Sequence, residues 1–151
     1  MGNLTKNLSR HEMACKNKCG FNRTDISIIH RLQVACDFAE AVVCQVRDIE
    51  DFRIVCNITS GTRCRSHHRN IYEKINGKKR DAGLPMIEIP WDSLHLADTN
   101  GISWAIDCQF PQLESMEIII FNKMLSRWSG GFHWYPDGKF WHFDTGIVRR
   151  W

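Results

Sequence analysis

Residues 130–146 read GGFHWYPDGKFWHFDTG and carry the clearest structural signal in the chain. Two aromatic runs, 132–135 and 140–145, flank the four residues Pro136-Asp137-Gly138-Lys139. Aromatic residues favour β-strands, and a short connection that contains Pro and Gly favours a tight reversal of the chain. The segment therefore predicts an antiparallel hairpin of two strands.

A long core helix is predicted to begin after Asp25, which is a suitable N-cap residue. A shorter helix is predicted from Ser9 through Cys15, because Ser9 followed by Glu12 is a capping-box pattern. In the long helix, apolar residues recur at the spacing of one helix face. They are Ile26, Ile29, Leu32, Ala35, Phe38, Ala39, Val42, Val43 and Val46.

The rest of the chain carries weaker strand and helix signals. Alternation of apolar and polar residues predicts strands over 53–59 and 103–110. Helices are predicted over 66–75 and 113–128. The turn-forming residues 76–83, which follow the first of these helices, predict a flexible, solvated loop. The predicted apolar stripe of the second helix consists of Met116, Ile119, Ile120, Met124 and Leu125.

Length and composition limit the class of protein. The 151 residues, of which 43% are apolar, suffice for one compact core, so we expect a single domain over residues 1–151. No stretch is apolar enough to span a membrane, and the start, MGNLTK, lacks the apolar core of a signal peptide. The net charge of +3 is spread over the chain and does not indicate a nucleic-acid partner.

Seven cysteines, an odd number, argue against a fully paired disulfide framework and favour a reducing compartment. Cys36, Cys44, Cys56 and Cys108 have apolar neighbours in the sequence, which predicts buried packing residues. The run 15–19, CKNKC, is typical of half of a structural metal site. No second Cys/His pair with clear zinc-finger spacing follows it.

His95, Asp107 and His142 each lie in a distinct short motif: SLH, AID and WHFD. Two imidazoles and one carboxylate suit a zinc ion with one open coordination position, which is typical of catalytic zinc. Taken singly, each histidine also fits a hydrogen-bonded structural residue. Together the three residues indicate a metallohydrolase. The histidines that fall in no ligand motif are expected to be structural: His11, His30, His67 and His68.

Five motifs in one order extend this hypothesis to a family: 9–15 SRHEMAC, 59–64 TSGTRC, 93–95 SLH, 105–107 AID, and 130–151 from GG through HFDTG to RRW. With these motifs the chain resembles the M15 zinc peptidases, the D-Ala-D-Ala carboxypeptidase-like group that includes phage endolysins and bacterial murein endopeptidases. The resemblance implies an α+β fold in which a small antiparallel sheet, flanked by helices, carries the zinc, similar to the peptidase-like core of hedgehog domains. It also implies peptidoglycan stem peptides as substrates.

The resemblance assigns His95 and Asp107 to the zinc ligands of the pattern S-x-H-x-x-G-x-A-x-D, and His142 to the ligand of H-x-D-x-G. Arg63 matches the arginine of an S-G-Y-R motif that faces the substrate, and its forked guanidinium suits a carboxylate or a developing oxyanion. A surface arginine that caps an element end is the alternative. Ser93 is expected either to bond the substrate or to cap its loop. Asp144 is expected to orient a ligand or the attacking water.

Two departures from the family pattern leave alternatives open. Where some relatives have a glutamate as general base, this chain has Lys139, so Asp137 in the turn and His133 on the adjoining strand are the candidate bases. Each also has a structural explanation, as a turn residue and a strand histidine. The interval before Asp107 is five residues longer than in the family, which predicts a bulged loop and leaves Asp98 as an alternative ligand.

These observations predict a zinc-dependent peptidase that hydrolyses an amide bond in peptidoglycan stem peptides. A non-catalytic, zinc-stabilised peptidoglycan-binding domain is the alternative, because the family's glutamate is missing. We expect a monomer without stable membrane insertion, located in the host or bacterial cytoplasm and acting at the cell wall after release, as a small phage lysin does.

Overall fold

The fold is an α+β arrangement built on a small sheet, seen in a computed structural model that describes residues 4–147 and 149–150. Four strands pair in antiparallel fashion in the order β2-β4-β6-β5, and the short β7 adds to β5 in parallel. The α+β class and the small antiparallel sheet are as predicted. The strands are β2 (Asn57–Ser60), β4 (Ala105–Gln109), β5 (Gly131–Tyr135), β6 (Phe140–Asp144) and β7 (Arg149–Arg150).

The predicted hairpin is confirmed as β5 and β6, joined by residues 136–139. The predicted strand over 103–110 is split at Trp104 into β3 (Ile102–Ser103) and β4, and β3 pairs in parallel with β1 (Arg23–Thr24). The strand predicted over 53–59 pairs only from Asn57 onward. The η1 segment (Arg10–Met13) has the expected capping box but ends before Cys15.

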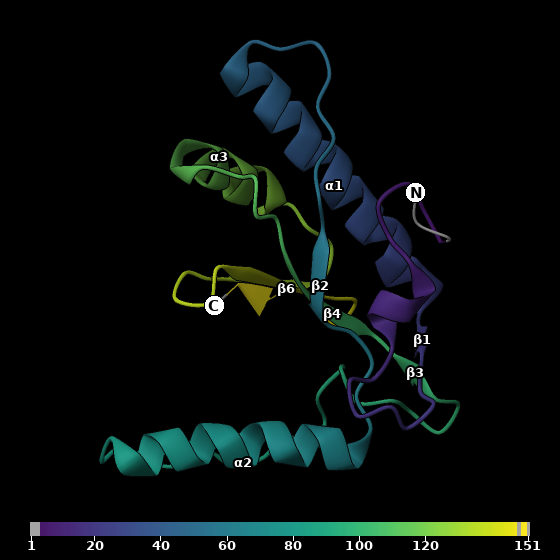
Figure 1. The fold of residues 1–151 in the computed structure, drawn as a ribbon, viewed down its shortest axis with the longest axis vertical. Helices are drawn as coiled ribbons and strands as arrows, with labels where there is room; N and C mark the ends of the chain where they lie inside the picture. The colour runs from purple at the N-terminus through teal and green to yellow at the C-terminus, as the bar shows by residue number, and fades with distance from the viewer. Residues whose placement is uncertain (1–3, 148, 151) are drawn as a thin grey trace.

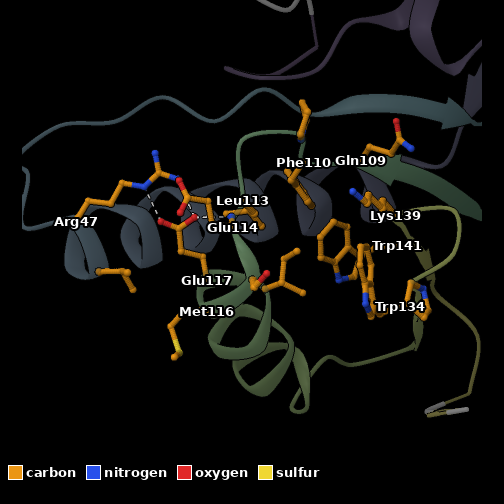
Figure 2. A pocket seen from close by; sticks show the side chains of 15 residues that line it. Arg47, Gln109, Phe110, Leu113, Glu114, Met116, Glu117, Trp134, Lys139 and Trp141 are labelled. Atoms are coloured by element: carbon orange, nitrogen blue, oxygen red, sulfur yellow. Dashed lines mark hydrogen bonds and ion pairs between the residues drawn. The ribbon is translucent and has the colours of Figure 1, made fainter.

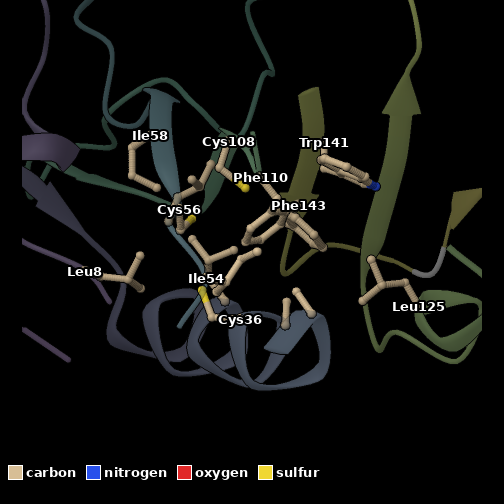
Figure 3. Packing of buried hydrophobic residues seen from close by; sticks show 14 of the residues in the cluster. Leu8, Cys36, Ile54, Cys56, Ile58, Cys108, Phe110, Leu125, Trp141 and Phe143 are labelled. Atoms are coloured by element: carbon tan, nitrogen blue, oxygen red, sulfur yellow. The ribbon is translucent and has the colours of Figure 1, made fainter. Parts of the chain in front are cut away.

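The long helix α1 (Ile26–Arg47) begins as predicted at Asp25, whose side chain accepts a hydrogen bond from the Ser27 amide. Its buried face packs against the sheet through residues such as Cys36 (Figure 3). The predicted stripe is wrong at Ile26, Phe38 and Val46, which are 57%, 39% and 41% exposed. These three residues lie outside the buried face of the helix.

Three of the four core cysteines are buried as predicted, namely Cys36, Cys56 and Cys108, whereas Cys44 is partly exposed. Figure 3 shows them among the apolar side chains that fill the space between α1 and the sheet. A hydrogen bond to Cys56 and burial raise the pKa of Cys36, a hydrogen bond to Cys108 and burial raise the pKa of Cys56, and burial raises the pKa of Cys108. They are therefore neutral packing residues.

The helix α3 (Ser115–Leu125) lies beside α1 (Figure 1). Its predicted stripe is wrong at Met116, Ile119 and Met124, which are 60%, 62% and 37% exposed, whereas Leu125 is buried as predicted. The buried face consists of Glu117, Phe121 and Leu125. A carboxylate can lie on this face because Arg47 of α1 bonds both of its oxygens, at 2.6 and 2.9 Å.

The helix α2 (Arg65–Asp81) lies on the other side of the sheet from α1 and α3 (Figure 1). The prediction of a flexible loop over 76–83 is wrong, because α2 continues through Gly77 to Asp81. Lys78, Lys79 and Arg80 occupy its last turn. Positive charge there interacts favourably with the helix dipole and offsets the cost of the glycine, about 1 kcal/mol. In the described part of the chain, every helix is too short or too polar to cross a membrane.

Candidate metal centre

The two faces of the sheet carry opposite chemistry. Successive residues of a strand point to opposite faces, so Ile106, Cys108, Trp141 and Phe143 enter the core, and the residues between them face away from it. Asp107 and His142 belong to this second set and lie directly opposite each other on β4 and β6. The alternation that builds the core thus also presents two candidate ligands on the side of α2.

The register extends this pair into a row of polar side chains across four strands. Ser60 on β2 lies opposite Asp107, and His133 on β5 lies opposite His142. Residues directly opposite one another share a face and have neighbouring Cβ atoms. The row Ser60, Asp107, His142 and His133 therefore forms the floor of the candidate site.

His95 reaches this floor from the loop between α2 and β3. The loop is fixed to Arg63 by two backbone hydrogen bonds, in which the Arg63 amide donates to the His95 carbonyl at 2.8 Å and the Ala97 amide donates to the Arg63 carbonyl at 3.0 Å. His95 Nε2 then lies 3.1 Å from Asp107 Oδ1 and 3.2 Å from His142 Nδ1. Because His142 Nδ1 lies 2.8 Å from the same oxygen, the three side chains converge on one point. They form a group that could hold a metal ion.

Hydrogen bonds on the far side of each ring select the nitrogen that faces this point. His95 Nδ1 donates to the Gly61 carbonyl at 3.0 Å, and His142 Nε2 donates to Asp144 Oδ2 at 3.1 Å. A ring nitrogen that donates a proton leaves the other nitrogen as an acceptor or a metal ligand. His95 Nε2 and His142 Nδ1 are thereby the available ligand atoms.

Asp144 is fully buried and is itself held in place by backbone amides. Its Oδ1 accepts hydrogen bonds from Gly131 at 3.0 Å and from Gly146 at 2.8 Å. Gly131 has no room for a side chain, because a Cβ there would collide with this carboxylate. Asp144 is therefore a fixed acceptor for the His142 ring.

Arg63 lies behind Asp107 and is 8% exposed. Its Nη2 donates to Asp107 Oδ2 at 2.8 Å, and its Nε donates to Ser60 Oγ at 2.8 Å. The alternative of a surface arginine is wrong. The guanidinium holds the second oxygen of Asp107, so Oδ1 is the oxygen that faces the two histidines.

The charges of the group favour a cation. Burial opposes ionisation of Asp107, but His95 and His142 outweigh it and hold the pKa of this carboxyl well below its usual range. Burial lowers the pKa of His95, whereas hydrogen bonds to Asp107 and Asp144 overcome the burial of His142 and raise its pKa to about 9. His142 is therefore protonated at neutral pH in the metal-free group, and a bound metal ion would displace the proton on its Nδ1.

A hollow of about 400 Å³ adjoins His142 and Asp144. Ser93 lines it and also caps its own loop, since its Oγ accepts a hydrogen bond of 3.4 Å from the His95 amide. A larger hollow of about 890 Å³ lies elsewhere, between α1, α3 and Trp141 (Figure 2). None of the three candidate ligands lines that larger hollow.

The two candidate bases occupy different places. His133 is half-buried beside His142, which together with burial lowers its pKa and favours the neutral form. Asp137 is exposed in the hairpin turn, at least two strand residues beyond His142, or about 7 Å. Among residues 4–147 and 149–150, no hydrogen bond or ion pair joins Asp137 to the three ligands.

Contacts also bear on the predictions made for Asp98 and His68. Asp98 is exposed and closes its own turn by accepting hydrogen bonds from Asn100 and Ile102, so Asp107 is the carboxylate that meets the two histidines. His68 is fully buried, with Nε2 3.0 Å from the Pro90 carbonyl, as expected of a structural histidine.

Sequence reasoning missed Ser60, Gly61 and Tyr72. The first two lie in the same TSGTRC motif as Arg63, so their place beside the site was within reach of that pattern. Tyr72 lies on α2, and burial raises its pKa while the charges of Arg63 and Asp107 also act on it. No sequence signal connects Tyr72 to the site, since its position depends on how α2 lies under the sheet.

No family model, curated protein or solved structure matches the chain.

Proposed function

We propose that this chain is a zinc peptidase that hydrolyses an amide bond in peptidoglycan stem peptides, with the fold of the D-Ala-D-Ala carboxypeptidase-like and hedgehog group. The observation that carries the proposal is the convergence of His95 Nε2, Asp107 Oδ1 and His142 Nδ1 within 2.8–3.2 Å of one another. Ligand atoms about 2.0–2.1 Å from a tetrahedral zinc lie about 3.3 Å apart. The three distances are somewhat shorter than this, so the donor atoms lie close to the positions of one face of such a tetrahedron.

Three protein ligands beside a hollow favour a catalytic site over a structural one, because a structural zinc is closed by four protein ligands. When bound, a zinc ion supplies Lewis acidity, which lowers the pKa of a coordinated water and polarises a carbonyl. The hollow of about 400 Å³ beside His142 offers the space for the substrate. Ser93 on its wall is placed to bond the substrate backbone.

The surrounding residues keep the ligands rigid. Arg63 holds Asp107, Asp144 holds His142, and the Gly61 carbonyl holds His95. The remaining N–H groups of Arg63 are the donors that we assign to a substrate carbonyl or carboxylate. His133 is the better placed of the two candidate bases, because it lies directly opposite His142 and its neutral form can accept a proton.

The substrate class comes from the five ordered motifs that resemble the D-Ala-D-Ala carboxypeptidase-like peptidases. In a phage lysin of this kind, the enzyme accumulates in the host cytoplasm and reaches the wall after membrane lesion. The alternative, a non-catalytic zinc-stabilised peptidoglycan-binding domain, is favoured by one observation: Lys139 occupies the place of the family's glutamate.

Purified protein supplied with zinc and incubated with murein distinguishes the two candidates. The peptidase releases new amino groups or free D-alanine, and His142→Ala abolishes this release together with one equivalent of bound zinc. Bound zinc and murein binding without any hydrolysis would establish the binding domain instead. Absence of zinc binding at micromolar concentration would overturn both. Mass spectrometry of digested muropeptides then identifies the bond.

A further inference from the structure

We propose a second metal site, in which Cys15, Cys19, Cys64 and His67 bind a structural zinc ion. It lies apart from the histidine and aspartate group and does not depend on the peptidase proposal. The CKNKC run supplies two ligands, and the start of α2 supplies the other two. Cys₃His is one of the common donor sets of closed, structural zinc.

The sulfur atoms already have the spacing of a zinc site. The Sγ atoms of Cys15, Cys19 and Cys64 all lie within 4.8 Å of one another, and Cys15 and Cys64 are 3.8 Å apart. Thiolates about 2.3 Å from a tetrahedral zinc lie about 3.8 Å from each other. The fourth donor is close, since His67 Nδ1 lies 3.3 Å from Cys15 Sγ.

The backbone turns between Cys15 and Cys19 so that their sulfur atoms lie close together. After Cys15 the chain turns sharply, with Lys18 and Gly20 at positive φ (53° and 90°), and the Cys15 amide bonds the Phe21 carbonyl at 2.8 Å. This turn carries Cys19 back toward Cys15. A two-cysteine turn of this kind presents both thiols to the same point.

Cys64 is the N-cap of α2, a position more often taken by Ser, Thr, Asp or Asn. Its Sγ accepts a hydrogen bond of 3.4 Å from the His67 amide, and Cys15 Sγ accepts one of 3.5 Å from the Cys64 amide. Backbone N–H groups at a helix N-terminus stabilise a thiolate, the form that binds metal.

The protonation of the cluster agrees with this geometry. Burial would raise the pKa of Cys64, but hydrogen bonds from His67, Cys19 and Cys15 outweigh it and lower the pKa. Burial lowers the pKa of His67, which favours the neutral, ligating imidazole. Burial raises the pKa of Cys15 to about 11, so this thiol gives up its proton only to a metal ion at neutral pH.

Packing alone does not explain the cluster. Cys19 is exposed, so its side chain gains little from the apolar core, unlike Cys36 or Cys56. The Sγ atoms of Cys15 and Cys64 are also much farther apart than the 2.0 Å or so of a disulfide.

The site would fasten the N-terminal segment to the loop that supports the first metal group. These segments already touch, because the Thr62 amide donates to the Met13 carbonyl at 3.0 Å. A Cβ on Gly61 would lie only 2.6 Å from that carbonyl oxygen, so only glycine allows the approach. Gly61 and Arg63 flank Thr62 in the same short segment as Cys64, and they hold His95 and Asp107.

The test uses the full chain with His142→Ala, purified under reducing conditions with zinc, so that the first group is disabled. We expect one tightly bound zinc per chain, and cobalt in its place should give the intense near-ultraviolet charge-transfer band of thiolate ligation. Adding Cys19→Ser should weaken zinc binding by more than the 10–100-fold that loss of a supporting residue costs. Adding His67→Asn should weaken it while leaving the thiolate band.

Cys44→Ser is the matched control, because Cys44 is partly exposed and lies outside the cluster. Cys19 is exposed, so its replacement leaves the packing of the apolar core unchanged. Three results would overturn the proposal: no zinc in the His142→Ala protein, equal zinc affinity in the Cys19→Ser and Cys44→Ser proteins, or a Cys15–Cys64 disulfide found by mass. None of these outcomes bears on hydrolysis, so the two proposals fail separately.

Discussion

The two candidate metal groups of this chain share one short segment but differ in donors and surroundings. Residues 61–64 supply Gly61 and Arg63 to the histidine and aspartate group, and Cys64 to the cysteine group. The first group has two ligands on the sheet and one on the loop between α2 and β3, beside a hollow. The second has three thiols and an imidazole that join a turn to a helix start. Under the two proposals, three ligands beside a hollow suit a catalytic zinc, whereas four ligands without an open position suit a structural one.

Removal of zinc from the cysteine group is expected to have the largest effect on stability. Zinc there links Cys19 to Cys64, and closing a loop of that length stabilises the folded chain by about 4 kcal/mol in the chain-entropy model. Urea unfolding of the His142→Ala protein, with and without a strong chelator, measures this loss. The same chelator should leave the His142→Ala/Cys19→Ser protein nearly unchanged; equal losses in both proteins would contradict the structural role.

Replacement of His133 is expected to have the next largest effect, and only on hydrolysis. His133→Asn removes the proposed base while keeping a polar side chain opposite His142, and the rate should fall at least 100-fold, or about 2.7 kcal/mol. Zinc content at both groups should not change. Asp137→Asn is the control, since this exposed turn residue should alter the rate little. The reverse pattern would assign the base to Asp137.

The sequence predicted elements whose signals are local. Asp25 caps α1 through its own neighbour Ser27, and the hairpin of β5 and β6 follows from its turn residues. The face of α3 could not be predicted in this way, because the helix is apolar on several sides. Arg47, distant in the sequence, decides that Glu117 is buried and Met116 is exposed.

The two metal groups show the same limit. The sequence predicts His95, Asp107 and His142 as one group because each lies in a motif. The register of β4 and β6 then places Asp107 opposite His142. The CKNKC run suggested only half a site. Its partners, Cys64 and His67, are apart in the sequence, and they meet Cys15 because the Met13 carbonyl bonds Thr62. That tertiary contact has no sequence signal of its own.

Asp144→Asn should weaken zinc binding at the histidine and aspartate group alone. The amide can still accept hydrogen bonds from Gly131 and Gly146, but its NH₂ cannot accept the proton of His142 Nε2. Loss of such a supporting carboxylate costs about 10–100-fold in metal affinity. Competition with a chromophoric chelator measures the change. Asp98→Asn, in an exposed turn, is the matched control and should match the parent protein; an equal loss there would contradict the assignment.

The smallest expected effect comes from replacing Glu117 of the Arg47–Glu117 ion pair. This pair makes the stability of the fold depend on pH in acid, independently of the two metal groups. Arg47 holds both oxygens of Glu117, whose side chain is 1% exposed, and this lowers the pKa of Glu117 below its ordinary value of 4.5. Because the folded-state pKa is the lower one, the stabilisation is present above pH 4.5 and is lost as the pH falls through the folded-state pKa.

Glu117→Gln should therefore cost about 1 kcal/mol at pH 7 and progressively less in acid. Urea unfolding at several pH values, with the chelator-treated His142→Ala protein as background, isolates this contribution from metal binding. Glu114→Gln is the control, because that carboxylate is 79% exposed and lies 3.4 Å from Arg47, a geometry that contributes little. A constant difference between the Glu117→Gln protein and its parent across pH would mean that packing, not charge, holds Glu117 in place. If the zinc-loaded protein loses more stability in acid than this background protein, the additional loss is due to protonation of the metal ligands.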